Sequence, residues 1–468
     1  MRRIAVIGGG AAGATVVAEL LRRDGGMELL WFTGQHRPGR GVAYATSQGN
    51  HLLNVHAANM GLLADDPGGL ARYLWKRRLP WTSGDFVPRA LFGDYIEDTL
   101  TRWIGNCPPG ASIDTIASEV VALRPSGTGY AIETDDRRRF VVDGAVLAVG
   151  ALPPVPIAEV KGDALASGRY LPDPWQRRHI PFEPQQIVVL GSGLTAVDAI
   201  LTATAHWPDA AIVALSRHGR LPAVHESTPS PPFAGAQALI ERLRFRPAIR
   251  HWVRLVRKTA RGQGADWRAI VDCLHPVTTE LWRLLDGVQR GRFLRHVRWA
   301  WEAVRHRSPP ASAKTIEQLR MDGQLFVLAG RVRRIEGTSP LLLTYTRRKD
   351  GSPGEFAADL VVQATGLQTQ VARTTHPLLR QMLREGLVRT DAQRLGIAAD
   401  IDGRVIRADG MVAPTLRVIG PLMRGVLWEC TALPEIRMSA ARLARDLSAE
   451  LQAERPFSDR GERAILAH

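Results

Sequence analysis

The chain has 468 residues, of which 45% are hydrophobic and 23% are charged, and its formal net charge is +15. The length predicts two or three domains, and this composition excludes a collagen-like, low-complexity or largely disordered chain. Most of the charge comes from residues 241–310, which hold 16 Lys or Arg against six Asp or Glu. The rest of the chain is nearly balanced, so the meaning of the charge depends on this one segment.

Cysteine usage favours a reducing compartment. Cys107, Cys273 and Cys430 are far apart and form no C-x-x-C pair, which argues against a disulfide framework, a cysteine-rich zinc site and a dithiol centre.

Residues 1–7 imitate the start of a signal peptide, but glycines interrupt the apolar run from position 8 onwards. No apolar run reaches the roughly 18 residues of a membrane span. We expect a cytoplasmic protein without stable membrane insertion.

The chain begins with the pattern of a strand, a tight turn and a helix. Residues 4–7 are apolar, and Val16, Val17, Leu20 and Leu21 then recur at helical spacing. Between them the G-x-G-x-x-G pattern is complete. The first glycine permits the turn, the second lets a pyrophosphate approach the backbone, and the third lets the helix pack on the strand. This first glycine turn, residues 8–13, predicts a dinucleotide site with Gly8, Gly10 and Gly13.

The adenosine end of this site departs from the pattern. The second strand, residues 28–32, is expected to end in an acidic residue that binds the ribose hydroxyls, and Thr33 stands there instead. A threonine offers a hydrogen bond but no charge. We therefore expect the adenosine of the first dinucleotide to be held by Thr33 more loosely, or by other residues.

A second glycine turn, residues 191–196, follows a β-rich run at 186–190 and precedes another helical pattern. Alanine is an accepted third residue of this motif, so the turn predicts a second cofactor site. The next strand, 212–215, ends near Arg217, whose charge and fork geometry suit a 2′-phosphate and favour NADPH over NADH. An ordinary surface arginine is the alternative. The cofactor-binding residues predicted here are Gly191, Gly193, Ala196 and Arg217.

Two dinucleotide sites in one chain indicate hydride transfer from NAD(P)H to bound FAD. Two further strand-like runs, residues 144–150 and 359–366, end in small residues, and the second reads Ala-Thr-Gly up to Gly366. Here the chain resembles the two-dinucleotide-binding-domain flavoproteins, in which such strands return the chain to the core under each cofactor. The fold class predicted is α/β, with two Rossmann-like dinucleotide-binding domains and a helical insert.

With these runs the chain resembles the bacterial FAD/NAD(P)-binding flavoprotein family that includes FAD-dependent urate hydroxylases. It is also similar to the two-dinucleotide-binding-domain flavin monooxygenases. Beside the Ala-Thr-Gly run, the stretches that carry the resemblance are residues 39–44, 51–55, 173–175, 420–425, 428–429 and 434–437. The resemblance implies an FAD-dependent monooxygenase that uses NAD(P)H and O2 to hydroxylate a small nitrogen-containing substrate. Urate, and with it a role in purine catabolism, is the substrate it favours.

The C-terminal part supplies most of the predicted catalytic residues. A final strand, residues 415–420, leads to a loop and then to a helix at about 432–451, with Pro434 in the first turn. The positive N-terminus of that helix would stabilise reduced flavin. Related flavoproteins commonly carry an acidic residue after the final glycine, but Pro421 follows Gly420 here, so another residue must contact the ribityl chain.

The loop combines charge and aromatic bulk suited to a planar anion at the flavin face. Asn54, in the connection after the first unit, is predicted to contact flavin. The alternative for the loop is a structural ion pair of Glu429 or Glu435 with Arg437. The predicted catalytic residues are Asn54, Arg424, Trp428, Glu429 and Arg437.

The basic segment reads as helices. Its tryptophans mostly share faces with leucines, which favours a hydrophobic core over a stacking platform for nucleic acid. We expect a lid or substrate domain, with Arg295, His296, Arg305, His306 or Arg307 facing the active site. The histidine pairs are not spaced with carboxylate partners as in a metal site, so neither a metal nor a nucleic-acid partner is predicted.

The sequence leaves several functions open and divides into segments. The partners are a small-molecule substrate and O2, and the oligomeric state is left open. Alternatives are an N-hydroxylating monooxygenase of an amino acid or amine, a flavin reductase or dehydrogenase without oxygenation, and a non-catalytic nucleotide-sensing or nucleic-acid-binding protein. The segments are an FAD-binding domain at 1–155 and 341–455, an NAD(P)H-binding domain at 183–222 and 323–340, a helical insert at 223–322, and a tail at 456–468.

Overall fold

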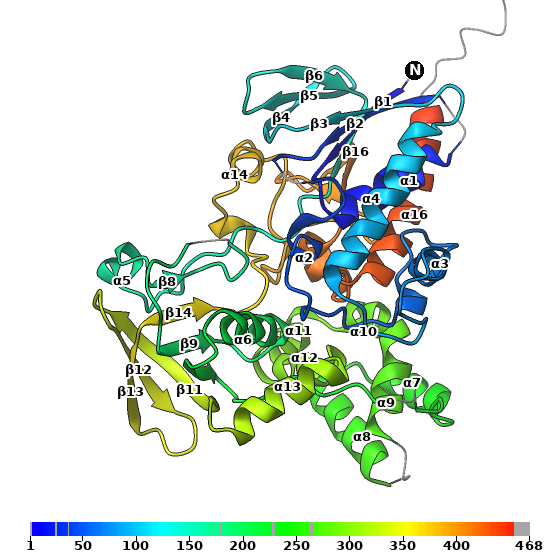
Figure 1. Ribbon diagram of the computed structural model, residues 1–468. Helices are drawn as coiled ribbons and strands as arrows, with labels where there is room; N and C mark the ends of the chain where they lie inside the picture. Colours follow the sequence, from blue (N-terminus) through cyan, green and yellow to red (C-terminus); the bar gives the residue numbers. More distant parts are fainter. Residues whose placement is uncertain are drawn as a thin grey trace, which may run out of the picture.

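Two separate sheets organise the chain, and a group of helices lies beside both (Figure 1). The computed structural model describes residues 2–23, 26–35, 37–176, 179–226, 230–262 and 266–453, so the tail predicted at 456–468 lies outside the described residues. The strands in the centre of both sheets are parallel. The predicted α/β class with two Rossmann-like units and a helical insert is confirmed.

The first sheet is parallel except for the antiparallel strand β15 at its edge. Its central strands are short and apolar because helices cover one face and a small sheet with one helix covers the other. Its order is β15 (Arg404–Ile406), β16 (Val412–Val418), β7 (Gly144–Leu147), β1 (Arg2–Ile7), β2 (Met27–Phe32) and β3 (Ser112–Ile116). One face carries α1 (Ala11–Leu21), α3 (Gly69–Lys76), α4 (Arg89–Gly105) and α16 (Leu433–Ala453), and the other carries β4 (Val120–Ser126), β5 (Gly129–Thr134), β6 (Arg139–Val142) and α14 (Pro377–Arg384).

The second sheet joins a parallel half to an antiparallel hairpin. Helices α6 (Leu194–His206) and α13 (Pro310–Met321) pack on its parallel half. Its order is β13 (Pro353–Ala358), β12 (Leu341–Arg347), β11 (Leu325–Glu336), β10 (Ala211–Ser216), β9 (Gln186–Leu190), β14 (Leu360–Gln363) and β8 (Tyr170–Leu171). The short helix α5 (Gly162–Ala166) contributes to the other face.

The helical insert has its own apolar cores, and Figure 1 shows it beneath the first unit and beside the second. One of these cores includes Trp428 of the first unit, so the insert is packed against that unit. Among the described residues, no helix is both long enough and apolar enough to cross a membrane. The insert consists of α7 (Ala236–Phe245), α8 (Ile249–Gly262), α9 (Trp267–Leu274), α10 (Thr278–Leu284), α11 (Gly287–His296) and α12 (Arg298–Arg305).

Two expected boundaries differ from the structure. The NAD(P)H unit does not end at residue 340, because β12, β13 and β14 all belong to the second sheet, and the chain returns to the first unit only after Gln363. The insert does not extend to 322, because α13 packs on α6 and is the crossover helix between β10 and β11. An apolar strand pattern identifies a strand but not the sheet that it joins.

Three short helices connect these elements near the predicted site. Each is a single turn or little more, and each lies in a loop between a strand and a longer helix. They are α2 (Gly41–Tyr44), the 3-10 turn η4 (Pro421–Met423) and α15 (Arg424–Leu427). The last two form the start of the C-terminal loop, residues 420–432.

Candidate functional site

The first glycine of each turn lies directly against a carbonyl of the returning strand. Gly8 has a φ of +129° and Gly191 a φ of +139°, which an L side chain rarely adopts. A Cβ at Gly8 would overlap the carbonyl oxygen of Ala148, and one at Gly191 would overlap that of Ala364. These carbonyls follow β7 and β14. Each of the two strand-like runs predicted from the sequence therefore ends against a glycine turn.

The second glycine of each turn faces open space. A Cβ at Gly10 would have the Cα of Gly41 as its nearest neighbour at 3.7 Å, and one at Gly193 would meet nothing within 4 Å. The packing of the chain therefore tolerates a Cβ at both positions. Space in front of the backbone is what a pyrophosphate needs at this glycine, so both turns fit a dinucleotide.

The third residue of each turn is in close contact with its own unit. A Cβ at Gly13 would overlap the carbonyl oxygen of Gly8, whereas the methyl group of Ala196 is fully buried. Neither α1 nor α6 has an acidic side chain in its first turn or a side-chain cap. The free N–H groups and positive dipole of both helix ends are thus available to phosphate.

Thr33 is turned toward the backbone of its own unit. The side chain is buried, and its hydroxyl lies 3.4 Å from the carbonyl oxygens of both Gly34 and Ile116. The preceding Trp31 donates from Nε1 to the carbonyl oxygen of Gly8 at 3.0 Å, which ties β2 to the glycine turn. The role of Thr33 at the ribose remains a prediction.

Basic side chains gather at the end of β10, where a 2′-phosphate would lie. Arg217 is exposed, and burial together with Arg348, Arg217 and Arg220 lowers the pKa of His218. The imidazole of His218 stacks on Trp299 of α12 at 4.1 Å with an interplanar angle of 12°. Arg348 could not be found from sequence, because it comes from the β12–β13 hairpin, which was assigned to the other domain.

Helix α12 lies between the end of β10 and the C-terminal loop. On one side Trp299 stacks on His218, as described. On the other side the carboxylate of Glu302 accepts from Arg298 Nε at 3.0 Å and from Arg424 of the C-terminal loop. Burial raises the pKa of Glu302, but the charges of Arg298 and Arg424 outweigh it and hold that pKa below its ordinary value.

Three of the predicted catalytic residues meet in the C-terminal loop. The guanidinium of Arg424 lies over the ring of Trp428 at 4.5 Å, and Glu429 Oε1 accepts from Trp301 Nε1 at 3.1 Å. Trp428 is buried and has a φ of +61°, a conformation that costs about 1–3 kcal/mol in a non-glycine residue. Its packing with Trp282 of the insert, with ring centroids 5.0 Å apart, holds it there.

The ion pair considered as the alternative for Arg437, with Glu429 or Glu435, does not form among the described residues. Arg437 Nη1 instead donates to the carbonyl oxygens of Asn59 at 2.8 Å and Gly61 at 3.2 Å, and so fastens α16 to that segment. Glu435 pairs with insert residues, at 2.5 Å from His275 Nε2 and 3.5 Å from Arg305. The docked insert supplies nearer cations for Glu429 and Glu435.

The remaining predicted positions lie along the edges of the first unit. Asn54 is half-buried, and its carbonyl oxygen accepts from His225 Nε2 at 3.1 Å. Gly366 has a φ of +96° and no neighbour for a Cβ within 4 Å. Gly420 has a φ of +83° and would place a Cβ 3.8 Å from that of Ala12, next to the first glycine turn. Direct flavin contact by these residues stays a prediction.

Unpartnered polar atoms cluster where the insert meets the C-terminal loop. Arg305 Nε, Arg424 Nε and Glu435 Oε2 are buried without a hydrogen-bond partner among the described residues. Buried polar atoms are nearly always satisfied by protein, water or ligand, and a polar occupant at this junction would find two donors and one acceptor. Sequence analysis missed Glu302, because its pairing with Arg424 depends on long-range packing.

His306 belongs to the same network. Burial lowers the pKa of His306 more than the charges of Glu429 and Glu302 raise it, which favours the neutral imidazole. Of the five insert residues expected at the active site, Arg305 and His306 lie in this network. Arg307 pairs with Asp272 inside the insert, while Arg295 and His296 are exposed.

Comparison with known proteins agrees with this geometry. Residues 5–152 match a family model described as FAD-NAD(P)-binding. That stretch contains the first glycine turn and β7. The predicted cofactors, FAD and NAD(P)H, are therefore confirmed as a class. The chain is also 21% identical over 216 residues to the uncharacterized protein YdhS of Escherichia coli (strain K12), a match that covers 43% of this chain and 39% of that protein.

Solved structures share the fold over nearly the whole chain. An L-lysine 6-monooxygenase from Pseudomonas syringae gives a TM-score of 0.63 at 18% identity, and the ornithine N-hydroxylase of Kutzneria sp. 744 gives 0.62 at 15%. The bacillithiol disulfide reductase of Staphylococcus aureus gives 0.57 at 12%. Each comparison covers 96% of this chain and 99% of the other. At these identities the likeness establishes the two-domain flavoprotein fold.

Valine substitutions at the second glycine of each turn should distinguish the FAD site from the NAD(P)H site. We expect Gly10→Val to fold but to purify without FAD, because its side chain enters the pyrophosphate space. Gly193→Val should keep FAD and lose NAD(P)H binding. Visible absorbance of the purified proteins and titration with NADP+ measure the two effects.

Gly49→Val is the matched control, because Gly49 also has nothing within 4 Å of its Cβ position but lies outside both turns. It should bind both cofactors as the unmodified protein does. Stoichiometric FAD on Gly10→Val would show that the first turn does not hold the pyrophosphate.

The burial of His225 predicts a pH-dependent stability. Burial and the charge of Arg307 lower the pKa of His225 to about 4, so the folded state resists a proton that the unfolded state accepts near 6.5. Stability is therefore lost as the pH falls from about 6.5 toward 4. Between pH 7 and pH 5 the protein should lose about 1–2 kcal/mol more than His225→Gln, measured by urea unfolding. Equal losses would rule out this contribution.

Proposed function

We propose that the protein is an FAD-dependent monooxygenase that uses NADPH and O2. The observation that carries the proposal is the position of α12. This helix contacts His218, at the end of β10 in the second unit, and Arg424, in the C-terminal loop of the first unit. One helix thus borders the site of the electron donor and the site of the flavin. When bound, FAD supplies the redox and oxygen-activating chemistry, and the chain supplies binding, orientation and exclusion of water.

The insert provides the water-excluding wall of this site. Trp282 Nε1 donates to the carbonyl oxygen of Gly425 at 2.9 Å, and Thr279 donates to that of Leu427 at 2.7 Å. Trp428 packs between Trp282 and Phe293, with ring centroids 5.0 and 4.8 Å away. These contacts seal the C-terminal loop from one side, which suits a reaction whose oxidising species is lost to water.

The polar network favours an amine substrate, and so the N-hydroxylating alternative. Two orphan donors, Arg305 Nε and Arg424 Nε, and one orphan acceptor, Glu435 Oε2, suit a molecule that carries both a carboxylate and an ammonium group. The neutral imidazole of His306 is available to accept the proton that an ammonium must lose before its nitrogen can react. Two of the solved relatives are named for lysine and ornithine.

Urate gains no support from these contacts. Arg437, one of the cations that could meet this anion, donates instead to two backbone carbonyl groups. A reductase without oxygenation remains the second candidate, because the bacillithiol disulfide reductase shares the fold. The cysteines do not favour a dithiol centre, since all three are unpaired and burial raises the pKa of Cys430 to about 12.

The proposal is tested by following NADPH oxidation, hydrogen peroxide and product together while amino acids and amines are supplied one at a time. A monooxygenase should show one substrate that accelerates NADPH oxidation, lowers the peroxide released per NADPH and yields a hydroxylamine detected by mass spectrometry. Peroxide in full yield with every compound, or electron delivery to a disulfide, would instead establish an oxidase or reductase.

Arg217 should determine the choice of nicotinamide cofactor. We expect Arg217→Ala to weaken NADPH binding by about tenfold or more, because a charge-assisted contact with the 2′-phosphate is lost. NADH binding should change little. Arg331→Ala, an exposed arginine on β11, is the matched control and should alter neither. Equal losses for the two cofactors in Arg217→Ala would remove the 2′-phosphate assignment.

A further inference from the structure

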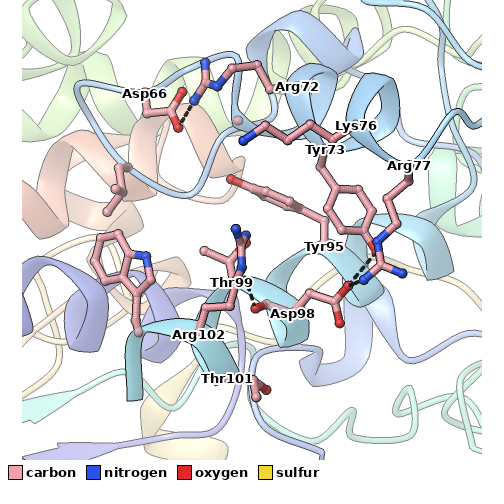
Figure 2. A pocket seen from close by; sticks show the side chains of 13 residues that line it. Asp66, Arg72, Tyr73, Lys76, Arg77, Tyr95, Asp98, Thr99, Thr101 and Arg102 are labelled. Carbon is pink, nitrogen blue, oxygen red and sulfur yellow. Dashed lines mark hydrogen bonds and ion pairs between the residues drawn. The ribbon is translucent and has the colours of Figure 1, made fainter. Parts of the chain in front are cut away.

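A pocket of about 480 Å³ lies between α3 and α4, in the first unit. Figure 2 shows Lys76 extending across it above Tyr95, with Arg102 entering from α4. The volume falls within the usual range for small-molecule sites. None of the residues that form the glycine turns or the C-terminal loop lines it. The pocket is therefore distinct from the predicted cofactor and substrate sites.

The charge of the lining is positive. Four cationic and two acidic side chains line the pocket, and each carboxylate is already paired: Asp66 with Arg72, and Asp98 with Arg77. Lys76 has no hydrogen-bond or ion-pair partner among the described residues. Arg102 donates only to the backbone carbonyl of Asp98 at 3.1 Å and to a threonine hydroxyl. Two cations are thus left to attract an anion.

The walls of the pocket are aromatic and firmly held. The rings of Tyr73 and Tyr95 meet edge to face, with centroids 5.5 Å apart and an interplanar angle of 66°. Tyr73 donates to Asp98 at 2.9 Å, and the hydroxyl of the buried Tyr95 accepts from the backbone N–H of Leu62 at 3.3 Å. Trp103 completes the wall. Such rings offer a planar ligand an apolar surface without costly reordering.

A second cavity borders the same helix. This cavity, of about 410 Å³, shares Arg102 and Trp103 with the first pocket and continues toward Leu21 and Arg22 at the end of α1. Arg22 is paired with Asp65, so the shared wall is where the free positive charge lies. A ligand with a planar body and one anionic group fits the first pocket, with room for a substituent beyond Trp103.

From this lining we propose that the pocket between α3 and α4 binds a small aromatic anion, with its ring against Tyr73, Tyr95 and Trp103 and its carboxylate or phosphate on Lys76 and Arg102. The segment that closes one side of the pocket also touches the predicted active site. Leu62 is held by Tyr95, and the neighbouring Gly61 accepts from Arg437 of α16. A bound anion would therefore contact the segment that Arg437 fastens.

The test uses the full chain saturated with FAD and NADP+, so that both glycine turns are filled. Isothermal titration with indole-3-acetate should show one site, whereas neutral indole should bind more weakly and tryptamine, with the opposite charge, should not bind. Lys76→Glu should raise the Kd for indole-3-acetate by about tenfold or more, because one charge-assisted contact becomes a repulsion. Lys76 is exposed and unpaired, so this variant should fold normally.

Lys314→Glu, which reverses an exposed lysine on α13, is the matched control and should leave the Kd unchanged. Tyr73→Leu provides a second variant that removes a ring and keeps the charge, and it should also weaken binding. The proposal is overturned if indole-3-acetate shows no saturable binding up to millimolar concentration, if tryptamine binds as well, or if the Kd is the same in Lys76→Glu. Each of these outcomes is independent of whether the enzyme hydroxylates an amine.

Discussion

The contact between a glycine and the end of a neighbouring strand determines the geometry of both halves of this molecule. Gly8 lies against the carbonyl of Ala148, and Gly191 lies against that of Ala364 in the same way. Because no side chain fits there, the turn stays tight, and the following helix starts with its N–H groups directed away from the strand. The position of each phosphate site follows from this contact, and the next glycine leaves that site open.

The helical insert contacts both units through α12. Some of its many arginines form ion pairs within the described part of the chain. Arg298 meets Glu302, Arg305 meets Glu435, and Arg307 meets Asp272. These acidic partners lie in the insert and at the start of α16, and Glu302 also pairs with Arg424, so ion pairs help hold α12 against the first unit.

The parts of the structure that depend on local pattern could be predicted from the sequence. The two glycine turns, the strands before them and the final helix all agree with the structure, because glycine spacing and apolar periodicity act within a few residues. Sheet membership could not be predicted for β12–β14, because an apolar run does not specify its neighbour. Glu302 escaped notice because its partner Arg424 is 122 residues away. Arg437 was recognised, but its backbone partners at residues 59 and 61 could not be.

The central claim is that one chain holds FAD in the first glycine turn and a nicotinamide cofactor in the second, near enough for electrons to pass. The most direct measurement is the visible spectrum of the purified protein, mixed with NADPH without oxygen in a stopped-flow instrument. The account predicts a yellow protein with about one FAD per chain, whose absorbance near 450 nm bleaches on mixing, as bound flavin reduced by a nicotinamide does. A colourless protein that takes up no added FAD and leaves NADPH unoxidised would contradict it.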